Sequence, residues 1–182
     1  ILFEQLRDIR NDVRIPLILM GYLNPIMKFG FEAFCQKCVE CGIDGVIIPD
    51  LPFKDYEETY KPIADRYDIR VIMLITPETS EARVREIDEH TNGFIYMVSS
   101  AATTGAQKDF DSQKQAYFKK IQDMHLRNPR MVGFGISNKQ TFDAACANSS
   151  GAIIGSRFVT LLNEAEGDAE KAITQLKENV GR

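Results

Sequence analysis

Two short stretches near the C-terminus decide the predicted fold: Met131-Val132-Gly133-Phe134-Gly135-Ile136-Ser137 and, after one helical segment, Gly151-Ala152-Ile153-Ile154-Gly155-Ser156. Each is a short apolar run that ends in glycine and is followed at once by serine and a helical pattern, which predicts a buried strand leading into a helix. Glycine lets a backbone come close to a ligand, and a helix N-terminus offers N–H groups and the positive end of a dipole. Two consecutive ends of this kind predict a phosphate cradle, although either one alone could simply close a tight turn.

The rest of the chain repeats the alternation of a short apolar run with a helical pattern. Apolar runs predict four earlier strands, at 15–20, 45–49, 69–75 and 94–98. Helical spacing predicts the intervening and closing helices, at 2–10, 32–41, 55–67, 81–89, 112–127, 158–165 and 169–180. Asp55 and Ser80 are the expected N-caps of two of these helices, and Pro62 predicts a kink or a restart within the helix at 55–67.

Six apolar strands joined by helical crossovers predict a parallel sheet in an α/β fold. A (β/α)8 TIM barrel takes about 250 residues and has its phosphate site after strands seven and eight. We therefore expect residues 1–182 to form a single, partial barrel domain of about six units, strands three to eight, with two units in front of Ile1. An open doubly wound sheet is the competing fold, but its phosphate loop usually follows the first strand, where this sequence has none.

An incomplete barrel would expose two sheet edges, and apolar edges invite pairing with another chain. We therefore expect the chain to remain associated with its missing part or to form oligomers, rather than to fold alone as a monomer.

Composition narrows the classes of partner. The 182 residues are 44% hydrophobic and 26% charged, with a formal net charge of -4 and a pI near 5.3. This balance argues against non-specific nucleic-acid binding and against an anionic membrane surface. No apolar run approaches the roughly 20 residues that span a bilayer, and the N-terminus has no signal pattern, so we expect a cytoplasmic protein.

Three cysteines, Cys35, Cys38 and Cys41, have the C-x2-C-x2-C spacing of part of a ferredoxin-type iron–sulfur run. The segment is predicted to be helical, so this spacing places the three on one broad face, and no fourth cysteine followed by proline comes after. Buried small residues are the simpler interpretation. His90 and His125 lie among charged neighbours without a third ligand, and we predict no metal site.

Four groups of residues, taken together, resemble the tryptophan synthase α-subunit family. They are Leu19–Pro25, Pro49–Pro52, Thr104-Gly105, and 133–137 with Gly155-Ser156. Other phosphate-binding barrels share the glycine ends but not the Tyr-x-Asn-Pro and Asp-x-Pro runs in these places. The resemblance implies a lyase of tryptophan biosynthesis that cleaves indole-3-glycerol phosphate to indole and glyceraldehyde 3-phosphate. It also implies an α2β2 heterotetramer in which indole passes through a tunnel to a pyridoxal-phosphate β subunit, with no cofactor in the α subunit.

The resemblance also assigns roles to individual residues. Backbone N–H groups on the substrate phosphate would come from Gly105, Gly135, Gly155 and Ser156. The indole pocket would contain Tyr22, Phe134 and Ile153, and Tyr96 would support catalysis beside the glycerol phosphate. Thr104 would order a mobile loop formed by the small residues at 99–106. Residues facing the β subunit would be Asn24, Pro25, Asp50 and Pro52.

Two departures from the family pattern matter. The family's catalytic Glu and Asp belong to the first two units, upstream of residue 1, so the catalytic residues of this chain are unknown and the fragment alone is expected to be inactive. Ser100 stands where many members have arginine. Asp50 is the carboxylate closest to a strand end, and it is either catalytic or, more simply, an interface or turn residue. The alternatives are a catalytically incomplete phosphate-binding module that docks on the β subunit, or another phosphate-binding TIM-barrel lyase or isomerase.

Overall fold

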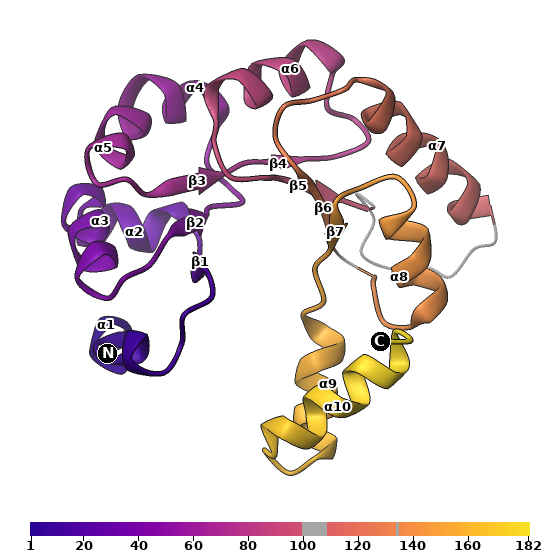
Figure 1. Cartoon of the computed structure of the whole chain (residues 1–182). Coiled ribbons are helices and arrows are strands. Elements are labelled where there is room, and N and C mark those ends of the chain that lie inside the picture. The colour runs from indigo at the N-terminus through magenta and orange to yellow at the C-terminus, as the bar shows by residue number, and fades with distance from the viewer. Residues whose placement is uncertain (100–108, 134) are drawn as a thin grey trace. The chain divides into compact units, whose positions relative to one another are not determined.

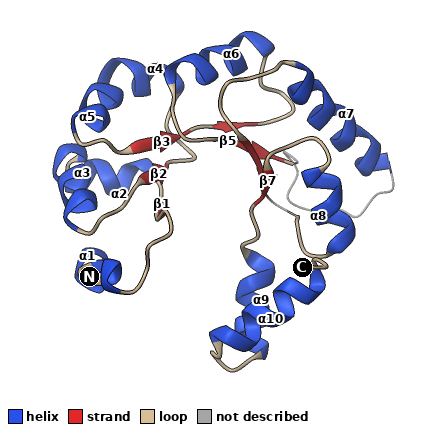
Figure 2. Ribbon diagram, viewed as in Figure 1, coloured by secondary structure: helices blue, strands red, loops and turns tan. Residues whose placement is uncertain are grey.

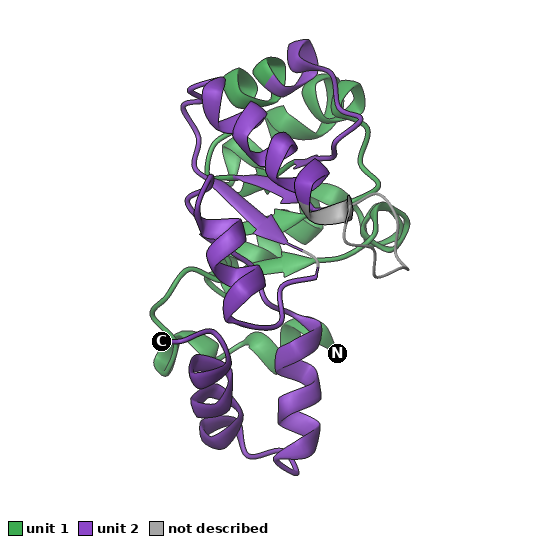
Figure 3. Ribbon diagram, turned by 90° about the vertical axis from the view of Figure 1, so that its right-hand side faces the viewer, with its two compact units in different colours: residues 1–73, 85–94 green, residues 74–84, 95–182 purple. Residues whose placement is uncertain are grey.

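The computed structural model describes residues 1–99, 109–133 and 135–182 (Figure 1). Strands and helices alternate along the chain (Figure 2), and every strand pairing is parallel, as the sequence predicts. The chain divides into two compact units, residues 1–73 with 85–94 and residues 74–84 with 95–182 (Figure 3). The division passes through one helix, α6 (Glu81–His90).

The first unit contains a three-stranded sheet in the order β1-β2-β3. Its strands are β1 (Ile18–Met20), β2 (Gly45–Ile47) and β3 (Arg70–Ile72). Its helical elements are α1 (Leu2–Leu6), the 3-10 turn η1 (Ile9–Asn11), α2 (Leu23–Phe29), α3 (Phe31–Glu40), α4 (Phe53–Asp55), the π-helical turn η2 (Tyr56–Tyr60) and α5 (Lys61–Arg66). Helix α5 packs against both α3 and β3.

The second unit contains a four-stranded sheet in the order β4-β5-β6-β7. Its strands are β4 (Leu74–Ile75), β5 (Ile95–Val98), β6 (Arg130–Gly133) and β7 (Gly151–Ala152). Its helices are α7 (Asp109–Asp123), α8 (Lys139–Cys146), α9 (Ser156–Glu164) and α10 (Ala169–Asn179). Helices α9 and α10 pack together around the buried residues Leu161, Ala165 and Ala172.

Most residues of β2, β3 and β5 are buried, which explains why these strands are continuous apolar runs, whereas Ile18 and Met20 of β1 are exposed. Val46, Ile72 and Val132 are almost completely inaccessible, as are Ile75, Ile95 and Met97. Each such side chain contributes about 1.5–3 kcal/mol of hydrophobic stabilisation. Burial on both faces is the pattern of parallel sheets covered by helices.

The structure corrects three local expectations. The predicted strand at 69–75 forms two strands, β3 and β4, with Met73 between them at the division of the two units. The predicted helix at 2–10 is a short α-helix followed by the 3-10 turn. Asp55 does not start the helical segment, because helix α4 begins two residues earlier, after Pro52, and the Asp55 side chain makes no capping hydrogen bond to the π-helical turn that follows.

Two other local predictions are confirmed. Helix α5 restarts at Lys61 with Pro62 in its first turn, where the missing N–H of proline costs nothing. Ser80 precedes α6, and its hydroxyl accepts a hydrogen bond from the Arg83 N–H at 3.3 Å. Among the described residues, none of the helices has the length and apolar character that crossing a membrane requires.

Candidate functional site

Three strand ends meet along one edge of the second unit. Tyr96 of β5 pairs with Met131 of β6, and Met131 pairs in turn with Gly151 of β7. Because these neighbours run parallel, their C-terminal ends lie at the same edge, where ligands of α/β sheets bind. The two glycine-ended strands that the sequence singled out are therefore adjacent.

Tyr96 extends over the neighbouring strand at Gly133. A Cβ atom built on Gly133 would lie 2.0 Å from the Tyr96 hydroxyl oxygen and 2.3 Å from the ring carbon that carries it. The Tyr96 side chain is only 5% exposed, and burial raises the pKa of its phenol, which keeps it protonated. Gly133 is thus required by the position of the tyrosine, and the protonated phenol can donate a hydrogen bond.

Gly135 is glycine for a different reason. Its φ of +75° lies in the left-handed region, where a side chain is strained. The Ser99 N–H donates to the Gly133 carbonyl oxygen at 3.2 Å, which brings the end of β5 beside this turn. A Cβ on Gly135 would lie 3.9 Å from the Lys114 Nζ and 4.0 Å from the Ser99 Oγ.

Helix α8, which follows Gly135, is capped at its N-terminus by hydrogen bonds from its own residues. It begins at Lys139 rather than at Ser137, and its N-cap is Asn138. The Thr141 N–H donates to the Asn138 Oδ1 at 2.9 Å, and the Asn138 N–H donates back to the Thr141 Oγ1 at 3.2 Å. This capping box corrects the expectation that both glycine ends lead directly into an open helix N-terminus.

Helix α9 behaves as the sequence predicts. It begins at Ser156, and its N-cap is Gly155. Glycine has no side chain that could accept a hydrogen bond from the first turn of the helix. The first backbone bond of the helix is donated by the Val159 N–H to the Gly155 carbonyl, so the N–H groups of the preceding residues have no partner within the helix. A Cβ on Gly155 would meet nothing within 4 Å. Open space and free N–H groups at a helix N-terminus are features that anion-binding sites use in general.

A cavity of about 330 Å³ adjoins Gly135. Residues of α7 and α8 form most of its wall, together with the two strand ends. They are Ser99, Lys114, Gln115, Phe118, Gly135, Ile136, Gln140, Thr141, Ala144 and Ala145. The sequence analysis placed Ser99 in the predicted mobile loop at 99–106, but the structure finds this serine buried at the end of β5. Lys114 was not predicted, because its spacing on α7 gave no signal.

The predicted interface residues belong to the first unit, where Asp50 has a clear structural role. Its Oδ1 accepts a hydrogen bond from the Leu23 N–H at 2.8 Å, at the first residue of α2. Asn24 and Pro25 are the next two residues of that helix, so Asp50 fixes the segment that carries them. This bond favours the structural interpretation of Asp50 over the catalytic one.

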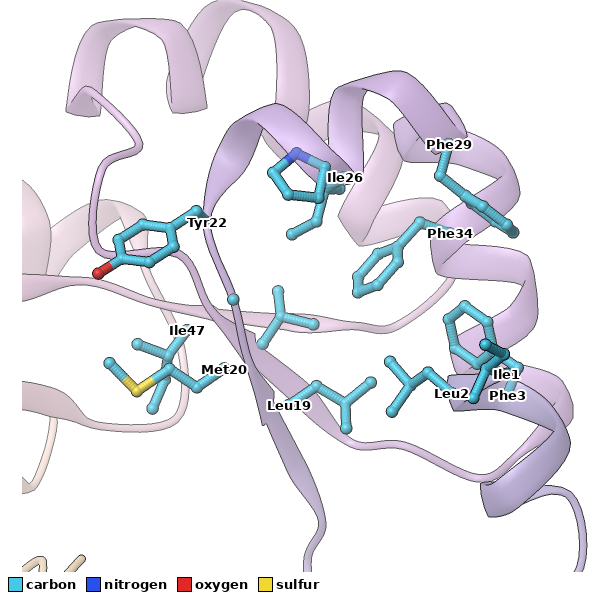
Figure 4. A pocket seen from close by; sticks show the side chains of 13 residues that line it. Ile1, Leu2, Phe3, Leu19, Met20, Tyr22, Ile26, Phe29, Phe34 and Ile47 are labelled. Carbon is cyan, nitrogen blue, oxygen red and sulfur yellow. The ribbon is translucent and has the colours of Figure 1, made fainter. Parts of the chain in front are cut away.

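Tyr22 lies beside this helix start and belongs to an apolar pocket of the first unit. It is the N-cap of α2 and is 69% exposed. Figure 4 shows its ring beside Met20 and Ile47, at one end of a cavity of about 350 Å³ whose other end is closed by Leu2, Phe3 and Phe34. Ile153 belongs to the second unit, so the indole pocket remains a prediction. Thr104, Gly105 and Phe134 lie outside the described residues.

The cysteine run is part of the hydrophobic core. Cys35 and Cys38 are completely buried, and burial raises the pKa of Cys35 to about 11 and that of Cys38 to about 12. Cys41 donates a weak hydrogen bond from its Sγ to the Phe3 carbonyl oxygen at 3.6 Å. The raised pKa values keep the Cys35 and Cys38 thiols protonated, and protonated thiols are poor metal ligands. In the part of the chain that the structure describes, no group of three or more His, Cys, Asp or Glu side chains is suited to a metal ion.

Parallel strands joined by helical crossovers, present in both units, define the class of α/β proteins to which (β/α)8 barrels belong. A family model described as tryptophan synthase alpha chain matches residues 1–182. The chain belongs to this family, and its function lies in tryptophan biosynthesis. Pyridoxal phosphate belongs to the beta subunit in this family, so no cofactor is assigned to this chain.

Relatives and solved structures agree with this assignment. The tryptophan synthase alpha chain of Bacteroides fragilis is 79% identical over 177 residues, which are 97% of this chain and 67% of the relative. That of Bacteroides thetaiotaomicron is 78% identical over 178 residues, with 98% and 69% covered. The Pyrococcus furiosus A-subunit structure superposes with a TM-score of 0.83 at 27% identity, covering 98% and 71%. The Legionella pneumophila alpha chain gives 0.82 at 30% identity, covering 98% and 66%.

Proposed function

We propose that this chain provides the phosphate-binding part of an indole-3-glycerol-phosphate lyase. The observation that carries the proposal is the contrast between two adjacent helices. Helix α8 caps itself through Asn138 and Thr141, whereas α9 begins at Ser156, directly after Gly155, with open N–H groups and free space before them. An anion is the ligand that such an N-terminus stabilises. Gly135, Gly155 and Ser156 would donate their N–H groups to the substrate phosphate.

The reaction is a retro-aldol cleavage. A general acid protonates indole C3, the bond from C3 to the glycerol chain breaks, and the adjacent hydroxyl loses its proton to become the aldehyde of glyceraldehyde 3-phosphate. Positioned proton transfer is worth roughly 10²–10⁴-fold in rate. Tyr96 is a supporting residue, because its protonated phenol lies at the strand edge that would hold the glycerol phosphate.

The catalytic carboxylates are proposed to come from outside residues 1–182. Asp50, the acidic residue that the sequence analysis placed next to a strand end, holds the Leu23 N–H at the start of α2. Residues 1–182 by themselves would therefore bind a phosphate ligand but release no indole. The same bond favours a second candidate function, a phosphate-binding module that docks on the beta subunit without turnover.

The partner in both cases is the beta subunit, in an α2β2 assembly. Asn24 and Pro25 on α2, with Asp50 and Pro52 after β2, are the proposed contact residues. The hydrogen bond from Leu23 to Asp50 supports this grouping, because it joins the two segments into one surface of the first unit. Docking would deliver indole to pyridoxal phosphate on the partner.

Indole release from indole-3-glycerol phosphate, measured with the beta subunit present, tests these proposals. The chain of residues 1–182 is expected to give no indole while it still binds glycerol 3-phosphate. The same chain extended to the full length of its relatives is expected to give indole. Absence of both binding and turnover in the extended chain would overturn the proposal.

A further inference from the structure

The ammonium group of Lys114 approaches the phosphate edge from helix α7. Its Nζ lies 3.9 Å from the position that a Cβ on Gly135 would occupy, and it shares the wall of the 330 Å³ cavity with Gly135 and Ser99. The side chain is half-buried, and its flexible four-carbon stem allows the ammonium group to move by several ångströms. A cation is therefore within reach of any anion that binds to the Gly135 N–H.

The proposed phosphate site otherwise consists of neutral groups. Gly135, Gly155 and Ser156 offer N–H groups and one hydroxyl, and a phosphate monoester carries close to two negative charges at neutral pH. The Lys114 ammonium group lies beside these strand ends, in the same cavity wall as Gly135.

We infer that Lys114 is a substrate-binding residue that supplies positive charge to the phosphate held at Gly135 and the start of α9. This inference rests on the proposed phosphate site and adds a charged side chain to it. Charge-assisted hydrogen bonds to phosphate are stronger than those between neutral groups, and partial burial in the cavity limits screening by salt.

Titration of residues 1–182 with glycerol 3-phosphate, followed by calorimetry at low salt, tests the inference. Lys114→Gln is expected to weaken binding by about 10-fold, while Lys114→Arg retains most of the affinity. Lys119→Gln is the matched control, since Lys119 lies on the same helix but pairs with Asp123 on the exposed face. It should bind like the unchanged chain. Circular dichroism of each variant shows whether the fold is retained.

The dependence on phosphate charge provides a second readout. Lowering the pH from 7.5 to 5.5 converts the phosphate dianion to the monoanion, since its second pKa is about 6. Affinity of the unchanged chain should fall more steeply over this range than that of Lys114→Gln. Equal affinity of Lys114→Gln and Lys119→Gln, with the unchanged chain still binding, overturns the role of Lys114 alone. Failure of the unchanged chain to bind glycerol 3-phosphate overturns the phosphate site itself.

Discussion

The Tyr96 hydroxyl occupies the space that a side chain on Gly133 would fill, with only 2.0 Å between its oxygen and the ideal Cβ position. The two residues lie on neighbouring parallel strands, two positions apart in register, because Val98 is the direct partner of Gly133. The aromatic ring therefore leans along the strands toward their C-terminal ends. In the motif Gly133-Phe134-Gly135, the first glycine is therefore explained by the space that Tyr96 needs and not by the approach of a ligand.

Gly133→Ala is expected to destabilise the chain by about 1–3 kcal/mol, because the added methyl group forces Tyr96 out of its position. Urea unfolding followed by circular dichroism measures the change. In a Tyr96→Ala background the same substitution should cost clearly less, since the clash has been removed. An equal cost in both backgrounds would show that Tyr96 is not the cause.

Gly155→Ala is expected to change the stability of the chain little but to weaken ligand binding. Its Cβ would meet no atom within 4 Å, and its φ of -109° suits any residue, so the free energy of unfolding should change by less than about 1 kcal/mol. The new methyl group would enter the space reserved for the ligand, and glycerol 3-phosphate should bind about 10-fold more weakly. A variant that binds as well as the unchanged chain would place the phosphate elsewhere.

Asp50→Ala should destabilise the first turn of α2. The carboxylate accepts the Leu23 N–H at 2.8 Å, and loss of such an acceptor costs about 1 kcal/mol. Hydrogen exchange should accelerate at Leu23 and its helical neighbours, while Asp50→Asn, which keeps one acceptor oxygen, should show a smaller effect. Unchanged exchange in Asp50→Ala would mean that this bond does not hold the segment.

The four free thiols should differ sharply in reactivity. Cys35, Cys38 and Cys41 are buried, whereas Cys146 is partly exposed. At pH 8 a disulfide reagent is expected to label one thiol rapidly in the folded chain, and the other three only after unfolding. Cys146→Ser should abolish the rapid phase. Rapid labelling of the α3 cysteines would contradict their place in the core.

The same burial predicts a loss of stability in alkali. Folding raises the pKa of Cys35 from 9.0 to about 11 and that of Cys38 to about 12, so the folded state retains protons that the unfolded chain loses. Their contribution to the free energy of unfolding is fully present below pH 9 and is lost between pH 9 and 12. Replacing Cys38 with alanine should flatten this part of the pH profile.

The order of strands and helices could be predicted because most strands lie within continuous apolar runs, such as the run that contains the buried Val132. The break between β3 and β4 could not be predicted. Met73 is as apolar as its neighbours, so the sequence at 69–75 gives no sign of an interruption. Asn138 and Thr141 did form a capping signal in the sequence. This signal distinguishes α8, whose N-terminus is capped by its own side chains, from α9, which has no side-chain cap. Interpreting this signal would have restricted the open helix N-termini of the proposed phosphate site to one helix instead of two.

Side-chain partners between distant segments were less predictable. The hydrogen bond between Asp50 and Leu23 joins residues 27 positions apart, and only the parallel pairing of β1 with β2 brings them together. Lys114 shares helix α7 with Lys119 and Lys120, and the direction of its side chain depends on the packing of α7 against the strand ends. Such placements follow from the tertiary structure and have no local pattern.

The central claim is that the edge formed by Gly135 and the start of α9 binds a phosphate. Amide NMR spectra of the chain, recorded with increasing glycerol 3-phosphate, test it most directly. We expect saturable shifts, and protection from hydrogen exchange, at the amides of Gly135, Gly155 and Ser156, with little change at Asn138 and Thr141 of the self-capped helix. Shifts confined to other segments, or none at millimolar ligand, would contradict the account.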